Sequence, residues 1–340
     1  MKRNDWALVL LLAVLLLAGA AACGSSNNNG NGSSSGDDDS HGDDDASPDD
    51  DDDIAPGWSE MASTTTNDLS AVTGTSPANV FAVGATGTIV HYDGSAWSTM
   101  QSGQNQLLSG VWAASASNVY VVGGDNVSGA AVMLQYDGSS WTPVNSGIAY
   151  RLNGVWGSSA TDIFAVCDIG NGPGGGVYHY DGSTWSAMTT PESFSPGTIW
   201  GTSASDVFAA SGGLIAHYDG STWAASTTVA NSISSFWGFS PTDVFAVGNV
   251  GIFLHYDGSS WTPTFGGNSG NLTGVWGTGD SDMYAVGSGN GAEILFYNGS
   301  TLSALATSGF GDYDLDGVWG SSATDVFAVG QSGTILHFAG

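Results

Sequence analysis

One unit of about forty residues recurs along most of this chain and constrains the fold more than any other feature. Each copy carries a Val-Trp-Gly segment, then a Val-Phe-Ala-Val segment, and then a Tyr-Asp-Gly turn. The first landmark falls on Trp in six copies and on Val in the copy before them: Val72, Trp112, Trp156, Trp200, Trp237, Trp276 and Trp319. The intervals run from 37 to 44 residues, so the sequence predicts seven copies of a unit with the length of one propeller blade.

Every copy contains four short apolar runs separated by Gly, Asn, Asp and Ser. Val, Ile, Phe, Tyr and Trp dominate these runs, which is the composition of β-strands. The sequence therefore predicts an all-β, seven-bladed β-propeller with four strands per blade, named a to d in chain order. The last copy stops at its third strand, Leu336-His337-Phe338, whereas Gly57–Met61 supplies an extra fourth strand. We therefore expect the N-terminal strand to complete the last blade and close the ring.

The first 53 residues differ from the repeats. Lys2 and Arg3 precede an apolar run from Trp6 to Ala22, which predicts a secretory signal peptide over residues 1–22. The run ends at Cys23 in a segment that resembles a bacterial lipobox, and this resemblance implies that Cys23 is the lipid attachment residue. Ordinary cleavage after Ala22 is the alternative. Residues 23–53 predict a disordered acidic tether and residues 54–340 the propeller. We expect an exported protein, lipid-anchored to the bacterial outer membrane or cell surface, that meets the membrane through its anchor alone.

Charge excludes several classes of partner. The chain has three Lys and Arg residues against 32 Asp and Glu residues, and Arg151 is the one cation after the signal peptide. Binding to a phosphate backbone needs several cations, so we expect no nucleic-acid partner. Arginine clamps on phosphate are excluded on the same ground.

The repeated turn suggests a family resemblance. Tyr-Asp-Gly recurs at Asp93, Asp137, Asp181, Asp219 and Asp257, with Asn298 in the sixth copy. With the regular Trp residues, this pattern resembles secreted bacterial Asp-box (BNR) and photosystem II assembly-factor-like propellers, with kelch-like spacing. The resemblance implies the fold and says little of function. Asp93 and Gly94 are adjacent here, whereas the Asp-box separates them by one residue, and a single Arg is too few for the sialidases of that family.

Three sets of polar residues need an interpretation. The histidines His91, His179, His217, His255 and His337 share one position on strand c, so they are expected to be buried, hydrogen-bonded and unable to converge on one metal ion. The Asp that precedes strand b, as at Asp162, is interpreted as an Asx-turn residue. Asp312, Asp314 and Asp316 match the opening of a calcium loop whose twelfth position is Ala323, which leaves calcium open as a ligand.

Loop variation indicates where a site lies. The a–b and c–d loops recur almost unchanged, whereas the b–c and d–a loops vary and lie together on the opposite face. The longest b–c loops and their neighbours belong to blades two to four. The candidate partner-binding residues there are Asp125, Tyr150, Arg151, Asp168, Asn171, Glu192 and Phe194. Pairing of Arg151 with Asp125 or Asp168 is the plain structural alternative.

These observations favour a surface-anchored protein- or glycan-binding or scaffolding module, and we do not expect an enzyme. The alternative is an extracellular carbohydrate-active enzyme, a lyase or glycosidase, with carboxylates near the propeller axis. A purely structural coat or tether component is a third hypothesis.

Overall fold

The computed structural model describes residues 57–125, 128–168, 176–265, 270–289, 292–305, 307, 309–311 and 313–340. The signal peptide, Cys23, the acidic tether and residues 54–56 lie outside the described residues, as do Asn171 and Asp312. No helix in the described ranges is long and apolar enough to cross a membrane.

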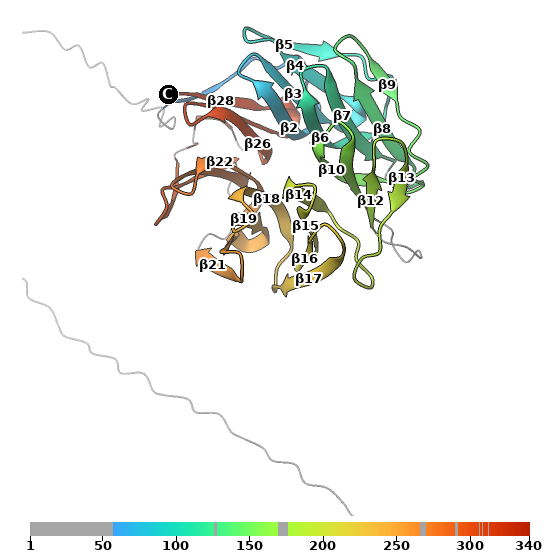
Figure 1. The fold of residues 1–340 in the computed structure, drawn as a ribbon. Helices are drawn as coiled ribbons and strands as arrows, with labels where there is room; N and C mark the ends of the chain where they lie inside the picture. The colour runs from blue at the N-terminus through green and yellow to red at the C-terminus, as the bar shows by residue number, and fades with distance from the viewer. Residues whose placement is uncertain are drawn as a thin grey trace, which may run out of the picture. The chain divides into compact units, whose positions relative to one another are not determined.

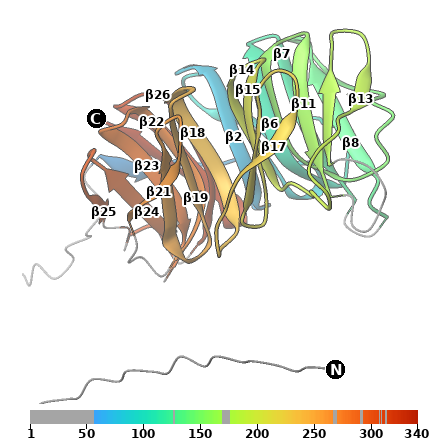
Figure 2. The ribbon, with the colours of Figure 1, turned by 60° about the horizontal axis from the view of Figure 1, so that its bottom comes forward.

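Seven four-stranded antiparallel sheets form a ring of blades, which confirms the predicted seven-bladed propeller (Figure 1). In each blade, strand a lies nearest the axis and strand d lies at the outside. Figure 2 shows the blades from the side, with their strands running between the two faces of the ring. Blades one to three comprise β2 (Leu69–Ser76), β3 (Asn79–Gly84), β4 (Ile89–Tyr92), β5 (Trp97–Met100); β6 (Leu107–Ser115), β7 (Asn118–Gly124), β8 (Ala131–Tyr136), β9 (Trp141–Pro143); and β10 (Leu152–Ser159), β11 (Asp162–Cys167), β12 (Val177–Tyr180), β13 (Trp185–Ala187).

Blades four to seven follow in chain order. They comprise β14 (Thr198–Ser203), β15 (Asp206–Ser211), β16 (Leu214–Tyr218), β17 (Trp223–Thr228); β18 (Ile233–Ser240), β19 (Asp243–Gly248), β20 (Ile252–Tyr256), β21 (Trp261–Phe265); β22 (Asn271–Gly279), β23 (Asp282–Ser288), β24 (Ala292–Tyr297), β25 (Leu302–Ala304); and β26 (Leu315–Ser322), β27 (Asp325–Gly330), β28 (Ile335–Ala339) with β1 (Trp58–Glu60).

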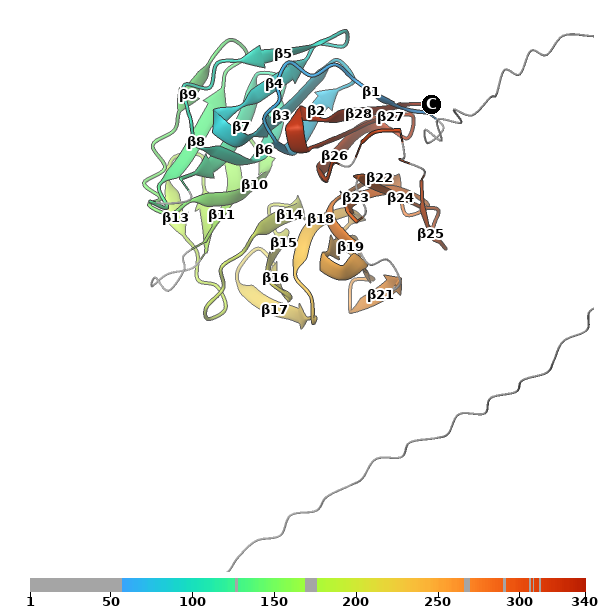
Figure 3. The same cartoon turned by 180° about the vertical axis from the view of Figure 1, so that it is seen from behind.

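The ring closes as the sequence predicts. β1 pairs antiparallel with β28, placing Trp58 opposite Phe338 and Glu60 opposite Leu336, and Figure 3 shows the two strands side by side. Trp58 is 3% exposed and its ring lies 5.6 Å from that of Phe338. The N-terminal strand therefore covers an edge of the last blade that would otherwise present unpaired backbone groups.

The core lies between blades and is built from strand b. In blade one, Val80 to Val83 are all fully buried, because one face of β3 packs on each neighbouring blade. Apolar residues on both faces of a strand require a sheet on either side. Radial stacking supplies that arrangement.

In blades two to seven, a Trp on strand a packs against the next blade and locks the two together. A Cβ atom added at Gly157 would lie 2.7 Å from the ring of Trp112, and one at Gly320 would lie 2.5 Å from Trp276. The glycine thus lets the indole of the preceding blade lie directly on the strand. The register corrects the position of the first copy: Thr73, and not Val72, pairs with Phe81 as Trp112 pairs with Tyr120.

The strand-c histidines are hydrogen-bonded, as predicted, although they are half-buried instead of buried. His179 Nε2 lies 2.6 Å from Asp162 Oδ1, and the His179 ring lies 4.5 Å from that of Phe164. The Asx-turn interpretation of Asp162 is wrong, because its second carboxylate oxygen accepts a hydrogen bond from Ser158. This Asp joins strands a, b and c of its blade and does not form a turn.

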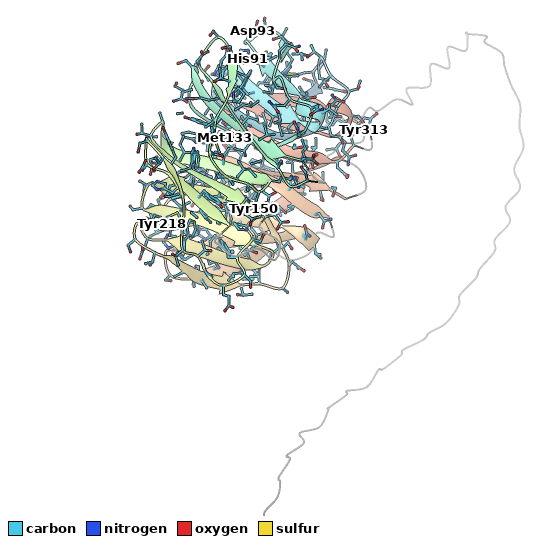
Figure 4. All side chains as sticks on the ribbon, turned by 90° about the vertical axis from the view of Figure 1, so that its right-hand side faces the viewer. His91, Asp93, Met133, Tyr150, Tyr218 and Tyr313 are labelled. Carbon is cyan, nitrogen blue, oxygen red and sulfur yellow. The ribbon has the colours of Figure 1, made fainter. Side chains whose placement is uncertain are left out.

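The Asx turn occurs instead at the Tyr-Asp-Gly repeat. Asp93 Oδ1 accepts hydrogen bonds from Ser95 N, Ser95 Oγ and Ala96 N at 2.9, 2.7 and 3.0 Å. The Ser95 hydroxyl, followed by the two backbone donors, lowers the pKa of Asp93 to about 2. Figure 4 places Asp93 at the outer edge of the domain, with His91 beside it. The uniform c–d loops are therefore accounted for by turn chemistry.

Candidate binding site at one face and the channel mouth

The b–c loops separate two regions of the irregular face. In blades one, five and seven the loop is one tight turn: η1 (Ala85–Gly87), η2 (Asn249–Gly251) and η3 (Gln331–Gly333). The glycine before each turn admits no side chain, since a Cβ at Gly330 would lie 2.0 Å from the Asp314 carbonyl oxygen. Blade three has Cys167 at this position, so its b–c loop cannot close in the same way. Cys167 is fully buried, and burial raises the pKa of its thiol to about 11.

The candidate residues surround the loops of blades two to four. Asp125 Oδ1 accepts a hydrogen bond from Ser128 N at 3.2 Å. Asp168 Oδ1 accepts one from Ser195 Oγ at 2.8 Å, which joins the b–c loop of blade three to the d–a loop that follows it. Glu192 in that second loop is exposed. The loops of this sector therefore support one another and still present carboxylates to solvent.

Tyr150 and Arg151 lie in the d–a loop between blades two and three. Tyr150 is half-buried and packs on the cluster that contains Ile148 and Leu152. Arg151 Nη2 donates to Ser109 Oγ at 3.2 Å, while Arg151 Nε is buried without a hydrogen-bond partner. Within the described ranges, Arg151 forms no ion pair with Asp125 or Asp168. The guanidinium thus reaches from the loops toward the axis.

Phe194 does not face solvent, and its expected contact with a partner is wrong. Its side chain is 1% exposed and packs among Val166, Val177 and Ile199. An aromatic side chain in a loop gains more from burial between two blades than from exposure to water. Phe194 therefore fixes the d–a loop, whereas Glu192 in the same loop is accessible.

A channel of about 610 Å³ runs along the axis between the seven a strands. Its wall changes character from one face to the other. A ring of valines with Ile199 and Phe236 lines its middle, and tryptophans lie toward the face that carries the a–b loops. Toward the irregular face the lining is polar. The channel volume lies within the range of ~300–1,000 Å³ that is common for small-ligand sites.

The polar lining comes from a repeated β-bulge. In six blades, the pairing of strand a with strand b shifts its register near the start of strand a. The shift falls between an apolar residue and the small residue two places later. A bulge leaves one residue unpaired and re-aims its side chain. The residue at this position lines the channel in every blade, and we call these seven residues the mouth ring: Ser70, Ser109, Asn153, Gly197, Ser234, Thr273 and Asp316.

Asp316 is the one carboxylate of the mouth ring. Burial first, and then the neighbouring carboxylates of Asp314 and Asp68, raise the pKa of Asp316 to about 6. Asp314 does not line the channel, and its Oδ2 accepts a hydrogen bond from Gln331 Nε2 at 3.0 Å. No three His, Cys, Asp or Glu side chains of the described ranges form a group that could hold a metal ion. Because Asp312 lies outside them, calcium binding stays a prediction.

Sequence reasoning identifies Asp316 for calcium and misses the rest of the mouth ring. A signal is nevertheless present: in six copies, a polar residue follows the apolar residue that begins strand a, although both its neighbours are apolar or small. Simple alternation along a strand does not reveal a bulge, so this pattern alone does not place the polar side chain in the channel.

Comparison with known proteins supports the propeller fold. No family model matches the sequence, and no curated protein does. Solved propellers do resemble the structure. "YCF48 bound to D1 peptide" is 15% identical, covers 84% of this chain and 97% of its own, and gives a TM-score of 0.66. The WD40 propeller domain of Doa1 is 12% identical, covers 83% and 95%, and also gives 0.66.

The extracellular domain of the one-component system BT4673 from B. thetaiotaomicron is 12% identical, with a TM-score of 0.66. The match covers 83% of this chain and 40% of that one. The expected resemblance to propellers is thus confirmed for the fold, and these comparisons give no support for the Asp-box family.

Proposed function

We propose that this chain is an exported, lipid-anchored binding module that holds a protein partner on the face carrying its b–c and d–a loops. The observation that carries the proposal is the asymmetry between sectors of that face. Three blades close their b–c loops with the same tight turn, whereas blades two and three carry long b–c loops, and long d–a loops precede blades three and four beside Arg151. The only cation after the signal peptide lies beside this sector, where a partner's acidic group would find its single complement.

The solved neighbours support a protein partner and export. YCF48 is a propeller described with a bound peptide, and the BT4673 match is an extracellular domain. The anchor rests on the lipobox-like segment ending at Cys23. Cys23→Ser should shift the protein from the membrane fraction to the soluble exported fraction, and an unchanged distribution would remove the anchor from the proposal.

Affinity capture from the proteins of the native cell surface tests the binding face. Immobilised wild-type protein should retain a partner. The Glu192→Ala and Arg151→Ala variants should lose this partner or bind it at least tenfold less strongly, because interface anchors of this kind contribute more than ~1 kcal/mol to binding. Tyr150→Ala should act in the same direction.

Tyr313→Ala is the matched control for Tyr150→Ala, since Tyr313 is an exposed tyrosine in the d–a loop before blade seven, away from blades two to four. It should leave capture unchanged. Melting temperatures of all variants must stay near that of the wild type. Equal capture by every variant would place the partner elsewhere and contradict the proposal.

The enzyme alternative has one observation in its favour. Asp316 lines the channel with a raised pKa, and Asp314 and Asp68 lie near enough to influence it. A carboxyl with a raised pKa is the group that a glycosidase uses as its general acid. Release of reducing sugar from polysaccharides that is lost in Asp316→Asn would establish the enzyme. The binding proposal expects no such release.

A further inference from the structure

Three consecutive blades place polar side chains of the mouth ring in one arc: Ser109 of blade two, Ser70 of blade one and Asp316 of blade seven. The Arg151 guanidinium is not part of the channel lining, but it extends this arc through its hydrogen bond to Ser109 Oγ. The a strands approach closely at this level. A Cβ added at Gly110 would lie 3.2 Å from Gly154 Cα, and one at Gly317 would lie 3.3 Å from Ala71 Cα. Neighbouring members of the mouth ring therefore lie next to one another.

Some members of the ring are already engaged by the protein. Asn153 Nδ2 donates to the Pro196 carbonyl oxygen at 3.2 Å, and Thr273 Oγ1 donates to the Leu315 carbonyl oxygen at 2.6 Å. Ser70, Ser234 and Asp316 differ. Their side chains form no hydrogen bond within the described part of the chain, although all three are half-buried. Half-buried polar groups without protein partners need another source of hydrogen bonds, either water or a ligand.

Charge narrows the class of ligand. One guanidinium and one carboxyl belong to the arc, so a cation would have to bind beside Arg151 and an anion beside Asp316. A ligand without net charge meets neither repulsion. Ser hydroxyls donate and accept, the guanidinium only donates, and an ionised carboxylate only accepts. A ligand that satisfies all three must offer both donors and acceptors, and a hydroxyl group supplies both.

Below the mouth ring the channel wall is small and apolar. Gly110, Gly154 and Gly317 form part of the next layer, followed by Val111 and Val155. This wall leaves room for an apolar surface and offers it van der Waals contact. The ligand therefore needs hydroxyl groups at its edge and a C–H face beneath them.

We propose that the mouth ring, together with the adjacent Arg151, binds a neutral saccharide residue, with its hydroxyl groups held by Arg151, Ser109, Ser70 and Asp316 and its C–H face against the channel wall. The inference shares the irregular face with the proposed function and adds a ligand class to it. Glu192 lies outside the mouth ring, so the two proposals are separable by experiment.

Saturation-transfer NMR tests the inference on the 54–340 chain, with methyl α-glucoside, methyl α-mannoside, methyl β-galactoside and N-acetylglucosamine as probes at millimolar concentration. At least one neutral sugar should receive saturation, and glucuronate and glucosamine should receive much less. Asp316→Asn and Arg151→Gln should each weaken the affinity about tenfold, the effect of losing a hydrogen bond to a charged group. Ser70→Ala should weaken it less. Glu192→Ala is the control and should leave it unchanged.

Three results would overturn the inference. One is no saturation transfer to any of the four neutral sugars. Another is equal affinity in wild type, Asp316→Asn and Arg151→Gln while all three melt alike. A third is preference for glucosamine or glucuronate over the neutral sugars. If sugar binding fails while Glu192→Ala still weakens capture of a protein partner, the saccharide inference falls and the proposed function stands. If a sugar binds while no protein is captured, the saccharide inference stands and the proposed function falls.

Discussion

The Trp319 indole lies on Gly74 of the next blade, so closely that a Cβ atom added to Gly74 would lie 2.5 Å from the ring carbon Cη2. The same relationship joins Trp156 to Gly201 and Trp200 to Gly238. This contact repeats around the axis and explains why Trp and Gly recur together in the sequence. A blade-to-blade lock of this kind makes specific predictions about packing.

Gly74→Ala should destabilise the protein by about 1–3 kcal/mol, the usual cost of overpacking a core. Its methyl group would have to displace the Trp319 ring. Gly279→Ala is the matched control, because a Cβ there meets no atom within 4 Å. Urea unfolding of both variants measures the difference. Equal stabilities would show that the indole can move aside without loss.

The lock is interrupted between blades one and two. Thr73 stands where six blades have Trp, and Ala113 stands where the other blades have Gly. We expect Thr73→Trp alone to destabilise the protein, because its ring would meet the Ala113 methyl group.

Thr73→Trp combined with Ala113→Gly should raise the free energy of unfolding by about 1–2 kcal/mol relative to Ala113→Gly alone, because the new indole buries apolar surface. A double-mutant cycle in urea gives the coupling energy between the two sites. If Thr73→Trp stabilises the protein equally with and without Ala113→Gly, the Ala113 methyl group does not keep an indole out of the contact between blades one and two.

Much of this architecture is predictable from the sequence. The blade count, the four strands per blade and the closing strand around Trp58 follow from repeat period and strand composition. The residue at the Trp position of the first copy is harder to predict. Only the pairing of Thr73 with Phe81 shows that this residue is Thr73 and not Val72. The burial of Phe194 depends on how a loop folds between two blades, which no local pattern records. Cys167 in place of a turn glycine is the local sign that the third b–c loop is irregular.

Ring closure predicts a sharp dependence on where the chain begins. A protein starting at residue 62 lacks β1 and leaves the edge of β28 unpaired. We expect a large loss of thermal stability together with oligomers, because an exposed apolar strand edge pairs with other chains. A protein starting at residue 54 is the control and should melt like the full chain. Equal melting temperatures and monomers for both lengths would show that β1 is dispensable.

Asp316 predicts how stability depends on pH. Its pKa is about 6 in the folded protein and near 3.8 when unfolded, so the folded state holds the proton more tightly. The ionised carboxylate therefore destabilises the fold above pH 6, and this penalty disappears as pH falls through 6 toward 4. Asp316→Asn should stabilise the protein by ~2 kcal/mol at pH 8 and by much less at pH 4. The value at pH 8 is reduced because the carboxyl is only half-buried and solvent screens part of the effect.

Urea unfolding at both pH values, in the presence of a chelator, measures this difference. Asp314 and Asp68 face the same carboxyl, and Asp68→Asn should lower the pKa of Asp316. A stabilisation by Asp316→Asn that is the same at both pH values would show that the Asp316 pKa is near its ordinary value.

Site-specific photo-crosslinking on the native cell surface tests the binding face most directly. A photoreactive residue at Glu192 lies on the irregular face over blades three and four, and one at Ser139 lies in a uniform c–d loop on the opposite face. Both positions are exposed. The account predicts a discrete crosslinked protein from position 192, lost with Arg151→Ala, and none from position 139. Crosslinks from position 139 alone, or the same product from both positions, would contradict it.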